Sequence, residues 1–172
     1  MIKHLFIICF FLLFLSTLIN AQQKDIRTSF RFPEGTWISE GTGKPGEGSG
    51  SFTFKFDLDE NIFVRKNITE FPATKDKPAS IHKDILVIYS SFKGIAERAI
   101  YFDNEGHTIN YSIDAGKSKV VFTSDSISNM PKFRLSYILE ESGRLLIRFE
   151  MSKPDKPENF FTYLEGYALK KQ

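Results

Sequence analysis

The stretch AERAIYFDNEGHTINYSI, residues 96–113, decides the fold class that this chain is expected to adopt. Apolar and polar residues alternate along each of its two halves, and that alternation is typical of half-buried β-strands. The halves are separated by Asp103-Asn104-Glu105-Gly106, in which Asn and Gly supply the backbone freedom that a tight turn needs. The stretch therefore predicts a hairpin of two antiparallel strands.

The same alternation continues outward from this hairpin almost to both ends of the chain. Further runs of this kind occupy residues 51–56, 62–69, 84–90, 119–124, 133–140, 144–151 and 159–169. Together they predict an all-β chain of about nine or ten strands, mostly joined as antiparallel hairpins. Pairing of an early strand at Trp37 with the final strand would remove both sheet edges. The expected fold is therefore a single up-and-down β-barrel of about 8–10 strands.

Three segments leave room for a helix instead of a strand. They are residues 23–32, 72–83 and 124–130. Pro72 and Pro78 favour a loop in the second segment, and Pro131 would stop any helix in the third. Helices are therefore expected to be minor elements of the fold.

A glycine-rich segment, EGTGKPGEGSGSF at residues 40–52, contains the spacing G-x-G-x-x-G at Gly41, Gly43 and Gly46. In dinucleotide-binding folds this spacing opens a helix whose N-terminus holds the pyrophosphate. Here more glycines and a proline follow, and the next regular element is a strand, so there is no βαβ unit. The Gly-Lys-Ser/Thr of a Walker loop and the companion motifs of a kinase are also missing. We therefore predict a hairpin loop between the first two barrel strands and no bound nucleotide.

Residues 1–21 have the plan of a secretory signal peptide. A short polar start with Lys3 and His4 precedes an apolar run, and Ala21 offers a small residue for cleavage. A retained membrane anchor is disfavoured because the run falls short of the roughly 20 apolar residues that a span needs. The predicted division is a cleaved signal peptide at 1–21, a lead-in at 22–34 and a barrel domain at 35–172. The mature chain is expected to be secreted or periplasmic, without a membrane span.

Composition and charge exclude several classes of protein. The formal net charge is +2, without the concentrated basic face of a nucleic-acid binder. The single cysteine, Cys9, lies in the segment that we expect to be removed, so disulfides and thiolate chemistry are not expected in the mature chain. No nucleophile elbow or histidine-based metal motif occurs. Catalytic residues, a metal site and a cofactor are therefore not predicted.

The opening GTWISEGTG, the YFDNEGHTINYS turn and the closing FFTYLEGYALKK resemble the calycin superfamily. More narrowly, the chain is similar to secreted bacterial lipocalin-like or fatty-acid-binding-protein-like barrels, many of them of unknown function. The resemblance covers nearly all of residues 30–172 and carries the G-x-W element that ends at Trp37. It implies that Trp37 lies on the first strand and closes one end of the barrel against a basic side chain, Lys170 or Lys171.

The histidines do not extend this resemblance to haem. In the haem-binding, nitrobindin-like branch the ligating histidine lies late in the chain, whereas no histidine follows His107 here. His82 precedes Lys83 and Asp84 at a strand start and is expected to be a solvated loop residue. Haem binding is therefore not implied.

Barrels that resemble this chain often place an arginine or a tyrosine in the lumen to meet a ligand. The candidate ligand-binding residues are Trp37, Arg98, His107, Tyr111, Tyr137 and Tyr163. Arg98 shares a strand face with Ile100 and Phe102, and alternation leaves open whether that face is the lumen or the outside. Arg134 and Arg148 are expected to point to solvent.

The leading hypothesis is a secreted or periplasmic, lipocalin-like barrel that binds a small hydrophobic or amphipathic molecule without catalysis. One alternative is an isomerase, cyclase or hydrolase of a lipid-like substrate, with Arg98, His107 and Tyr111 as the residues to test. Another is a structural or interaction module of the cell envelope with a filled barrel. A pocket of a few hundred Å³ would favour a binder, and a lumen packed with Phe would favour the module. The sequence predicts no nucleic-acid partner and leaves the oligomeric state open.

Overall fold

The computed structural model describes residues 30–41, 48–90 and 96–172, and every regular element in them is a β-strand. The strands are β1 (Gly35–Ser39), β2 (Ser49–Asp57), β3 (Ile62–Phe71), β4 (Ser80–Ser90), β5 (Ala96–Asp103), β6 (Thr108–Ala115), β7 (Lys119–Ser124), β8 (Phe133–Leu139), β9 (Leu145–Lys153) and β10 (Lys156–Lys170). The predicted all-β class is confirmed, and the ten strands lie within the expected number.

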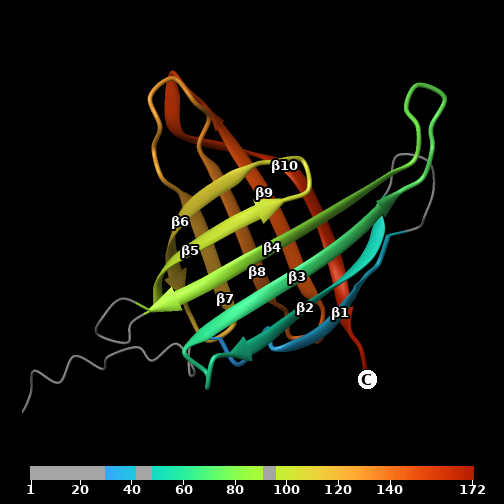
Figure 1. The fold of residues 1–172 in the computed structure, drawn as a ribbon, viewed down its shortest axis with the longest axis vertical. Helices are drawn as coiled ribbons and strands as arrows, with labels where there is room; N and C mark the ends of the chain where they lie inside the picture. The colour runs from blue at the N-terminus through green and yellow to red at the C-terminus, as the bar shows by residue number, and fades with distance from the viewer. Residues whose placement is uncertain (1–29, 42–47, 91–95) are drawn as a thin grey trace, which may run out of the picture.

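The ten strands form one closed antiparallel barrel in which neighbours in sequence are neighbours in space. The barrel closes where β1 pairs with β10, with Trp37 opposite Lys170 and Ser39 opposite Ala168. In Figure 1 strands β2 to β5 cross in front of strands β7 to β10 at a steep angle, as the tilt of barrel strands requires. The up-and-down topology expected from the sequence is confirmed.

One end of the barrel is sealed by the residues that precede β1. Phe30 lies in a turn there, is fully buried, and has its ring 5.5 Å from that of Phe63. The indole nitrogen of Trp37 donates a hydrogen bond to the Pro33 carbonyl oxygen at 2.8 Å. The Lys170 ammonium lies 5.7 Å from the centre of the Trp37 ring. Of the two lysines considered for this position, Lys170 is therefore the one that contacts the tryptophan.

The glycine-rich segment joins β1 to β2, as predicted, and its residues 42–47 lie outside the described part of the chain. Gly35, two residues before Trp37 and outside the glycine-rich segment, has a φ of +114°, a conformation that only glycine adopts without strain. A Cβ at Gly50 would lie 2.0 Å from the Ile68 carbonyl oxygen. Backbone geometry of the barrel therefore requires glycine at both positions.

Several predictions fall on connecting or undescribed segments. The signal peptide, Cys9 and residues 22–29 of the lead-in lie outside the described residues. The β3–β4 connection at 72–79 is a loop, and the β7–β8 connection at 125–132 contains turns but no helix. Within residues 30–41, 48–90 and 96–172, no helix is long and apolar enough to cross a membrane.

Side chains that face the interior fill its two halves differently. Next to Trp37 the core is built mainly from aromatic rings, with Phe54 and Phe63 stacked 5.2 Å apart. We refer to this as the closed half. The other half lies toward the β3–β4 and β9–β10 connections, which project away from each other in Figure 1. We refer to it as the open half, because inward-facing side chains such as Leu164 remain accessible to solvent there.

Candidate ligand-binding site

Arg65 lies across the interior where the closed half meets the open half. Its Nη1 donates a hydrogen bond to the hydroxyl of Tyr137 on β8, and its Nη2 forms an ion pair with Asp84 on β4. The Arg65 and Asp84 side chains are only 7% and 4% exposed. Among the described residues, no acceptor bonds to the buried Nε of Arg65. The guanidinium is thus enclosed by the protein with one of its three nitrogens unpaired.

Strand register explains why these charges meet inside the barrel. Arg65 shares the inward face of β3 with Phe63, and Asp84 shares that of β4 with Leu86; Phe63 and Leu86 are both fully buried. Arg65 lies opposite Leu86 in the ladder, and Asn67 lies opposite Asp84, so the two charges are diagonal neighbours. A buried ion pair costs desolvation energy and gives little net stability. A gain in stability is therefore a poor explanation for this pair.

Hydrogen bonds continue from Asp84 toward the open half. Asn67 Nδ2 donates to Asp84 Oδ2 at 2.8 Å and lies 3.2 Å from Thr69 Oγ1. His82 Nε2 lies 3.3 Å from Asp84 Oδ2 and 3.1 Å from the Tyr101 hydroxyl oxygen. The name polar cluster is used below for Arg65, Asn67, Thr69, His82, Asp84, Tyr101 and Tyr137. Asn67, Thr69 and His82 are only partly buried, so a molecule in the open half would meet their polar atoms.

A second group of hydrogen bonds links the polar cluster to the rim at the β5–β6 turn. The Tyr101 hydroxyl donates to Asp103 Oδ2 at 3.2 Å. Asp103 Oδ2 also lies 2.8 Å from His107 Nδ1. His82 Nδ1 lies 3.0 Å from Glu105 Oε1. The His107 side chain is 63% exposed. Polar contacts therefore run without a break from the buried arginine to solvent.

The surroundings of the polar cluster fix several protonation states. Burial is the main cause that raises the pKa of Tyr101, Tyr111 and Tyr137, so all three hydroxyls stay protonated. Burial alone would lower the pKa of Arg65, but Tyr137 and Asp84 outweigh it and the pKa is raised. The cluster thus combines one permanent cation, the adjacent carboxylate and neutral hydroxyl groups.

Apolar side chains of β8, β9 and β10 line the opposite side of the open half. The name apolar wall is used below for Phe133, Phe149, Phe161, Tyr163 and Leu164. The Phe133 and Phe149 rings stack with centroids 5.7 Å apart, and Tyr163 meets Phe149 edge-on at 6.2 Å. Tyr163 and Leu164 are 68% and 52% exposed, although Leu164 lies opposite the inward-facing Phe149 in the ladder. An exposed apolar surface of this kind is suited to bind an apolar molecule.

Gly166 on β10 leaves space beside this wall. Its neighbour Glu165 faces outward and accepts a hydrogen bond from Arg148, so a side chain at Gly166 would point inward. A Cβ built there would meet no heavy atom within 4 Å. In the part of the chain that the structure describes, β1 pairs only with Ala168, Leu169 and Lys170 of β10. The open half is therefore unfilled next to β10.

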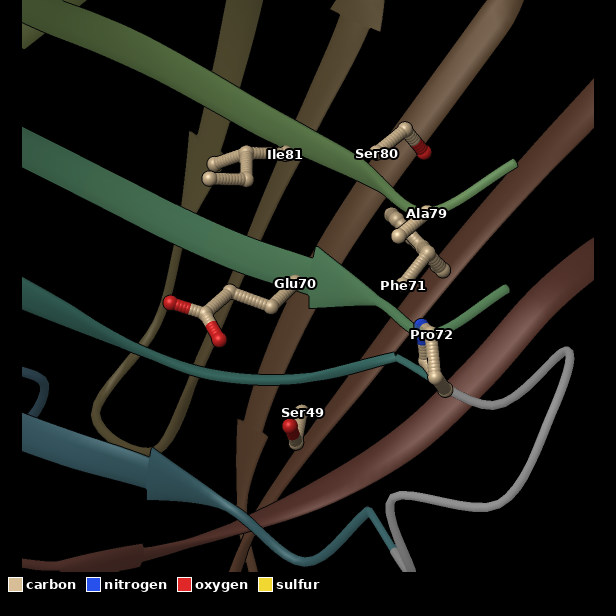
Figure 2. Close-up of a pocket in the computed structure, with 7 residues that line it drawn as sticks. All are labelled: Ser49, Glu70, Phe71, Pro72, Ala79, Ser80 and Ile81. Carbon is tan, nitrogen blue, oxygen red and sulfur yellow. The ribbon is translucent and has the colours of Figure 1, made fainter.

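A pocket of about 440 Å³ lies at the tip of the β3–β4 hairpin. Figure 2 shows the residues that line it: Ser49, Glu70, Phe71, Pro72, Ala79, Ser80 and Ile81. They come from the start of β2, the end of β3, the start of β4 and the two ends of the β3–β4 connection, and none belongs to the polar cluster. Phe71 lies on the same strand face as Arg65 and Thr69. Ser49, Glu70 and Ile81 are cross-strand neighbours on the other face of these strands, so the pocket lies at the end of the β3–β4 hairpin and not inside the open half.

Four of the six predicted ligand-binding residues belong to the interior of the barrel. Trp37, Tyr111 and Tyr137 are at most 1% exposed. Trp37 seals the closed end, whereas Tyr137 supports Arg65. Tyr163 forms part of the apolar wall. The structure thus brings Tyr137 and Tyr163 to the candidate site from two different strands.

The other two predicted residues, Arg98 and His107, lie elsewhere. Arg98 is on the outer face of β5 and pairs with Asp125 through two hydrogen bonds, of 2.9 Å and 2.5 Å. His107 lies at the rim, connected to the polar cluster only through other side chains. Arg134 and Arg148 are partly exposed on the outer face, as predicted.

Sequence reasoning missed Arg65, Asp84 and His82. The prediction that His82 is a solvated loop residue is wrong, because β4 already begins at Ser80 and the His82 side chain is only 25% exposed. Arg65 lies two residues from Phe63, and Asp84 lies two residues from Leu86, so each charge shares a strand face with a large apolar residue. That spacing could have marked both residues as candidates for the interior. Both faces of these strands carry apolar residues, however, so alternation could not tell which face is inside.

The described residues contain no group of three or more His, Cys, Asp and Glu side chains that could hold a metal ion. No protein-family model matches the chain, and no curated protein matches it at a significant level of sequence similarity.

Proposed function

We propose that this barrel binds a small amphipathic molecule in its open half and does not transform it. The observation that carries the proposal is that a partly buried polar cluster, mainly on β3, β4 and β5, and an exposed apolar wall on β8, β9 and β10 belong to the same half of the barrel. A molecule with a polar head and an apolar tail satisfies both sides at once. Ligand sites in barrels have this composition, mostly apolar with a few convergent polar groups.

The two sides contribute in different ways. Covering the exposed rings of the apolar wall favours binding by about 25 cal/mol per Å² of apolar surface removed from water. The polar cluster adds orientation, because a buried polar group that loses its water partner must find another. Affinity thus comes mainly from the tail and selectivity mainly from the head.

Membership of the calycin superfamily and a secreted or periplasmic location belong to the same proposal. The closed up-and-down barrel and the contact between Trp37 and Lys170 support the family assignment. The signal-peptide plan of residues 1–21 supports the location. Mass spectrometry of the protein exported from an expressing bacterium should find a mature chain that starts at Gln22. A chain that keeps residues 1–21 would contradict this part.

The experiment for binding uses the neutral fluorescent probe N-phenyl-1-naphthylamine and the variant Gly166→Leu. A leucine at this position fills the space beside the apolar wall. We expect probe affinity to fall by about tenfold or more, since the apolar surface is then covered by the protein itself. The matched control is Thr162→Leu, which adds an apolar side chain to an exposed position of the same strand. Equal probe binding by the wild type and Gly166→Leu would overturn the proposal.

The second candidate function, an enzyme acting on a lipid-like substrate, is favoured by one observation. His82 lies within hydrogen-bond distance of the Tyr101 hydroxyl and close to Asp84, an arrangement that can move a proton. Turnover of an ester or an epoxide of a fatty alcohol that disappears in His82→Gln would support it. Unchanged turnover in that variant, or none in the wild type, would leave binding as the function.

A further inference from the structure

We propose that the polar cluster selects amphiphiles with an uncharged, hydroxyl- or amide-bearing head over fatty carboxylates. This inference rests on the proposed function and specifies its ligand class. It follows from the charge balance of the cluster and from the hydrogen-bonding character of its accessible atoms.

The charge of Arg65 is already balanced. Its Nη2 is paired with Asp84, and its Nη1 is bonded to the Tyr137 hydroxyl. A carboxylate head would therefore approach a pair that is neutral overall and would come close to the Asp84 anion. Because both charges are withdrawn from water, repulsion from Asp84 is weakly screened. The cluster offers an incoming anion no uncompensated cation.

The accessible members of the cluster both donate and accept hydrogen bonds. Asn67 carries an amide, Thr69 and Tyr101 carry hydroxyls, and His82 carries an imidazole. A carboxylate only accepts, whereas a hydroxyl or an amide head both donates and accepts. Such a head matches the mixed set of partners and brings no charge that must be desolvated.

The apolar wall across the open half receives the tail. Its Phe133 and Phe149 rings stack, and Tyr163 meets Phe149 edge-on. An uncharged head at the polar cluster and an apolar tail on this wall are therefore accommodated together.

The experiment compares ligands that share one twelve-carbon chain. Glycerol monolaurate, sodium laurate and dodecylamine are titrated against the wild-type protein loaded with N-phenyl-1-naphthylamine, below their aggregation concentrations and at about pH 8, above the ordinary pKa of histidine. We expect glycerol monolaurate to displace the probe at a concentration about tenfold lower than laurate does. The carboxylate of laurate would lie unpaired near the Asp84 anion, and this weakens its binding. Dodecylamine distinguishes a preference for neutral heads from a general attraction of cations.

The variant Asp84→Asn tests the cause of the preference. It keeps the size of the side chain but removes the negative charge, so Arg65 becomes available to an anion. Laurate should then bind about tenfold better relative to glycerol monolaurate than it does to the wild type. The control Asp114→Asn makes the same chemical change at an exposed position of β6 and should keep the wild-type ranking. Circular dichroism checks that both variants are folded.

Each outcome decides the inference. Wild-type protein that prefers laurate or dodecylamine to glycerol monolaurate overturns it, while the proposed binding function stands. A failure of all three ligands to displace the probe overturns the proposed function, and the inference falls with it. An unchanged ranking in folded Asp84→Asn also overturns it, because the charge of Asp84 is then not the cause. If Asp84→Asn does not fold, the ranking in the wild type alone decides.

Discussion

The closed and the open half of this barrel are built by the same strands but are filled differently. In the closed half, Phe63 contacts the rings of Phe30, Phe54 and Phe56 and is fully buried. In the open half, the side chain of Tyr163 meets one ring and is 68% exposed. One half is thus packed as a core, and the other leaves apolar surface exposed to solvent.

The boundary between the halves is a polar layer and not a gap in packing. Arg65 connects β3 to Tyr137 on β8, and the Tyr137 ring packs edge-on against Phe54 from the closed side. The hydroxyl end of Tyr137 faces the cluster, while its ring belongs to the aromatic core. Tyr137 therefore belongs to both regions, because its ring packs in the aromatic core and its hydroxyl is part of the polar cluster.

The largest expected effect comes from removing one ring in each half. Phe63→Ala should lower the free energy of unfolding by about 3–5 kcal/mol, because it leaves a cavity among packed aromatic rings. Tyr163→Ala should cost about 0.5 kcal/mol or less, since the ring is largely exposed. Denaturation by urea, followed by tryptophan fluorescence, measures both. Similar losses for the two variants would break the distinction between the halves.

The next effect concerns the boundary. Asp84→Asn should lower the free energy of unfolding by about 3 kcal/mol, because the buried guanidinium of Arg65 loses its counter-charge. The double variant Arg65→Met/Asp84→Asn should be more stable than Asp84→Asn alone, since no buried charge then remains unpaired. The same denaturation experiment gives both values. A double variant less stable than the single one would show that Arg65 stabilises the barrel through its own packing.

A smaller change in stability is expected when glycine is replaced by alanine, and its size should differ between Gly50 and Gly166. Gly50→Ala should destabilise the barrel by about 1–3 kcal/mol, because the new methyl group meets the backbone of β3 and the strands must shift. Gly166→Ala should leave stability unchanged or raise it by about 0.5–1 kcal/mol, because alanine loses less backbone entropy on folding. The contrast rests on a Cβ distance of 2.0 Å at Gly50 against open space at Gly166. Equal losses would mean that the open half is filled.

The smallest effect is a pH dependence at the rim of the open half. The hydrogen bond with Asp103 is the main cause that raises the pKa of His107, and its charge adds to this. For Asp103, burial acts to raise the pKa, but the backbone and side-chain hydrogen bonds from His107 outweigh it and the pKa is lowered. The pair therefore stabilises the fold fully between the ordinary pKa of aspartate and the ordinary pKa of histidine. Its contribution is lost as the pH falls through the lowered pKa of Asp103 or rises through the raised pKa of His107.

Nuclear magnetic resonance titration of the histidine ring protons checks this prediction. The pKa of His107 should lie above the ordinary histidine value and return toward it in Asp103→Asn. The variant Glu70→Gln, which removes an exposed carboxylate of β3, is the control and should leave the His107 titration as it is. A His107 pKa that does not respond to Asp103→Asn would show that the pair is not formed in solution.

Much of the fold was predictable from short-range pattern. The alternation in residues 96–113 and in the runs around it identifies strands, because neighbouring side chains of a strand point to opposite faces. The turn residues between the runs predict antiparallel hairpins, and ten such strands close into a barrel. The resemblance implied a tryptophan contact at one end, and the structure shows it between Trp37 and Lys170.

The candidate site depends on information that a local pattern does not carry. Alternation shows that successive side chains point to opposite faces of a strand, but it does not show which face is inside the barrel. It therefore could not place Arg98 outside the barrel or Arg65 inside it. Arg65 and Tyr137 stand 72 positions apart in the sequence and meet only because the barrel closes. The sequence alone determined the strands and their order. Only the tertiary structure decided which faces look inward, which charges they bring together, and where the core ends and free space begins.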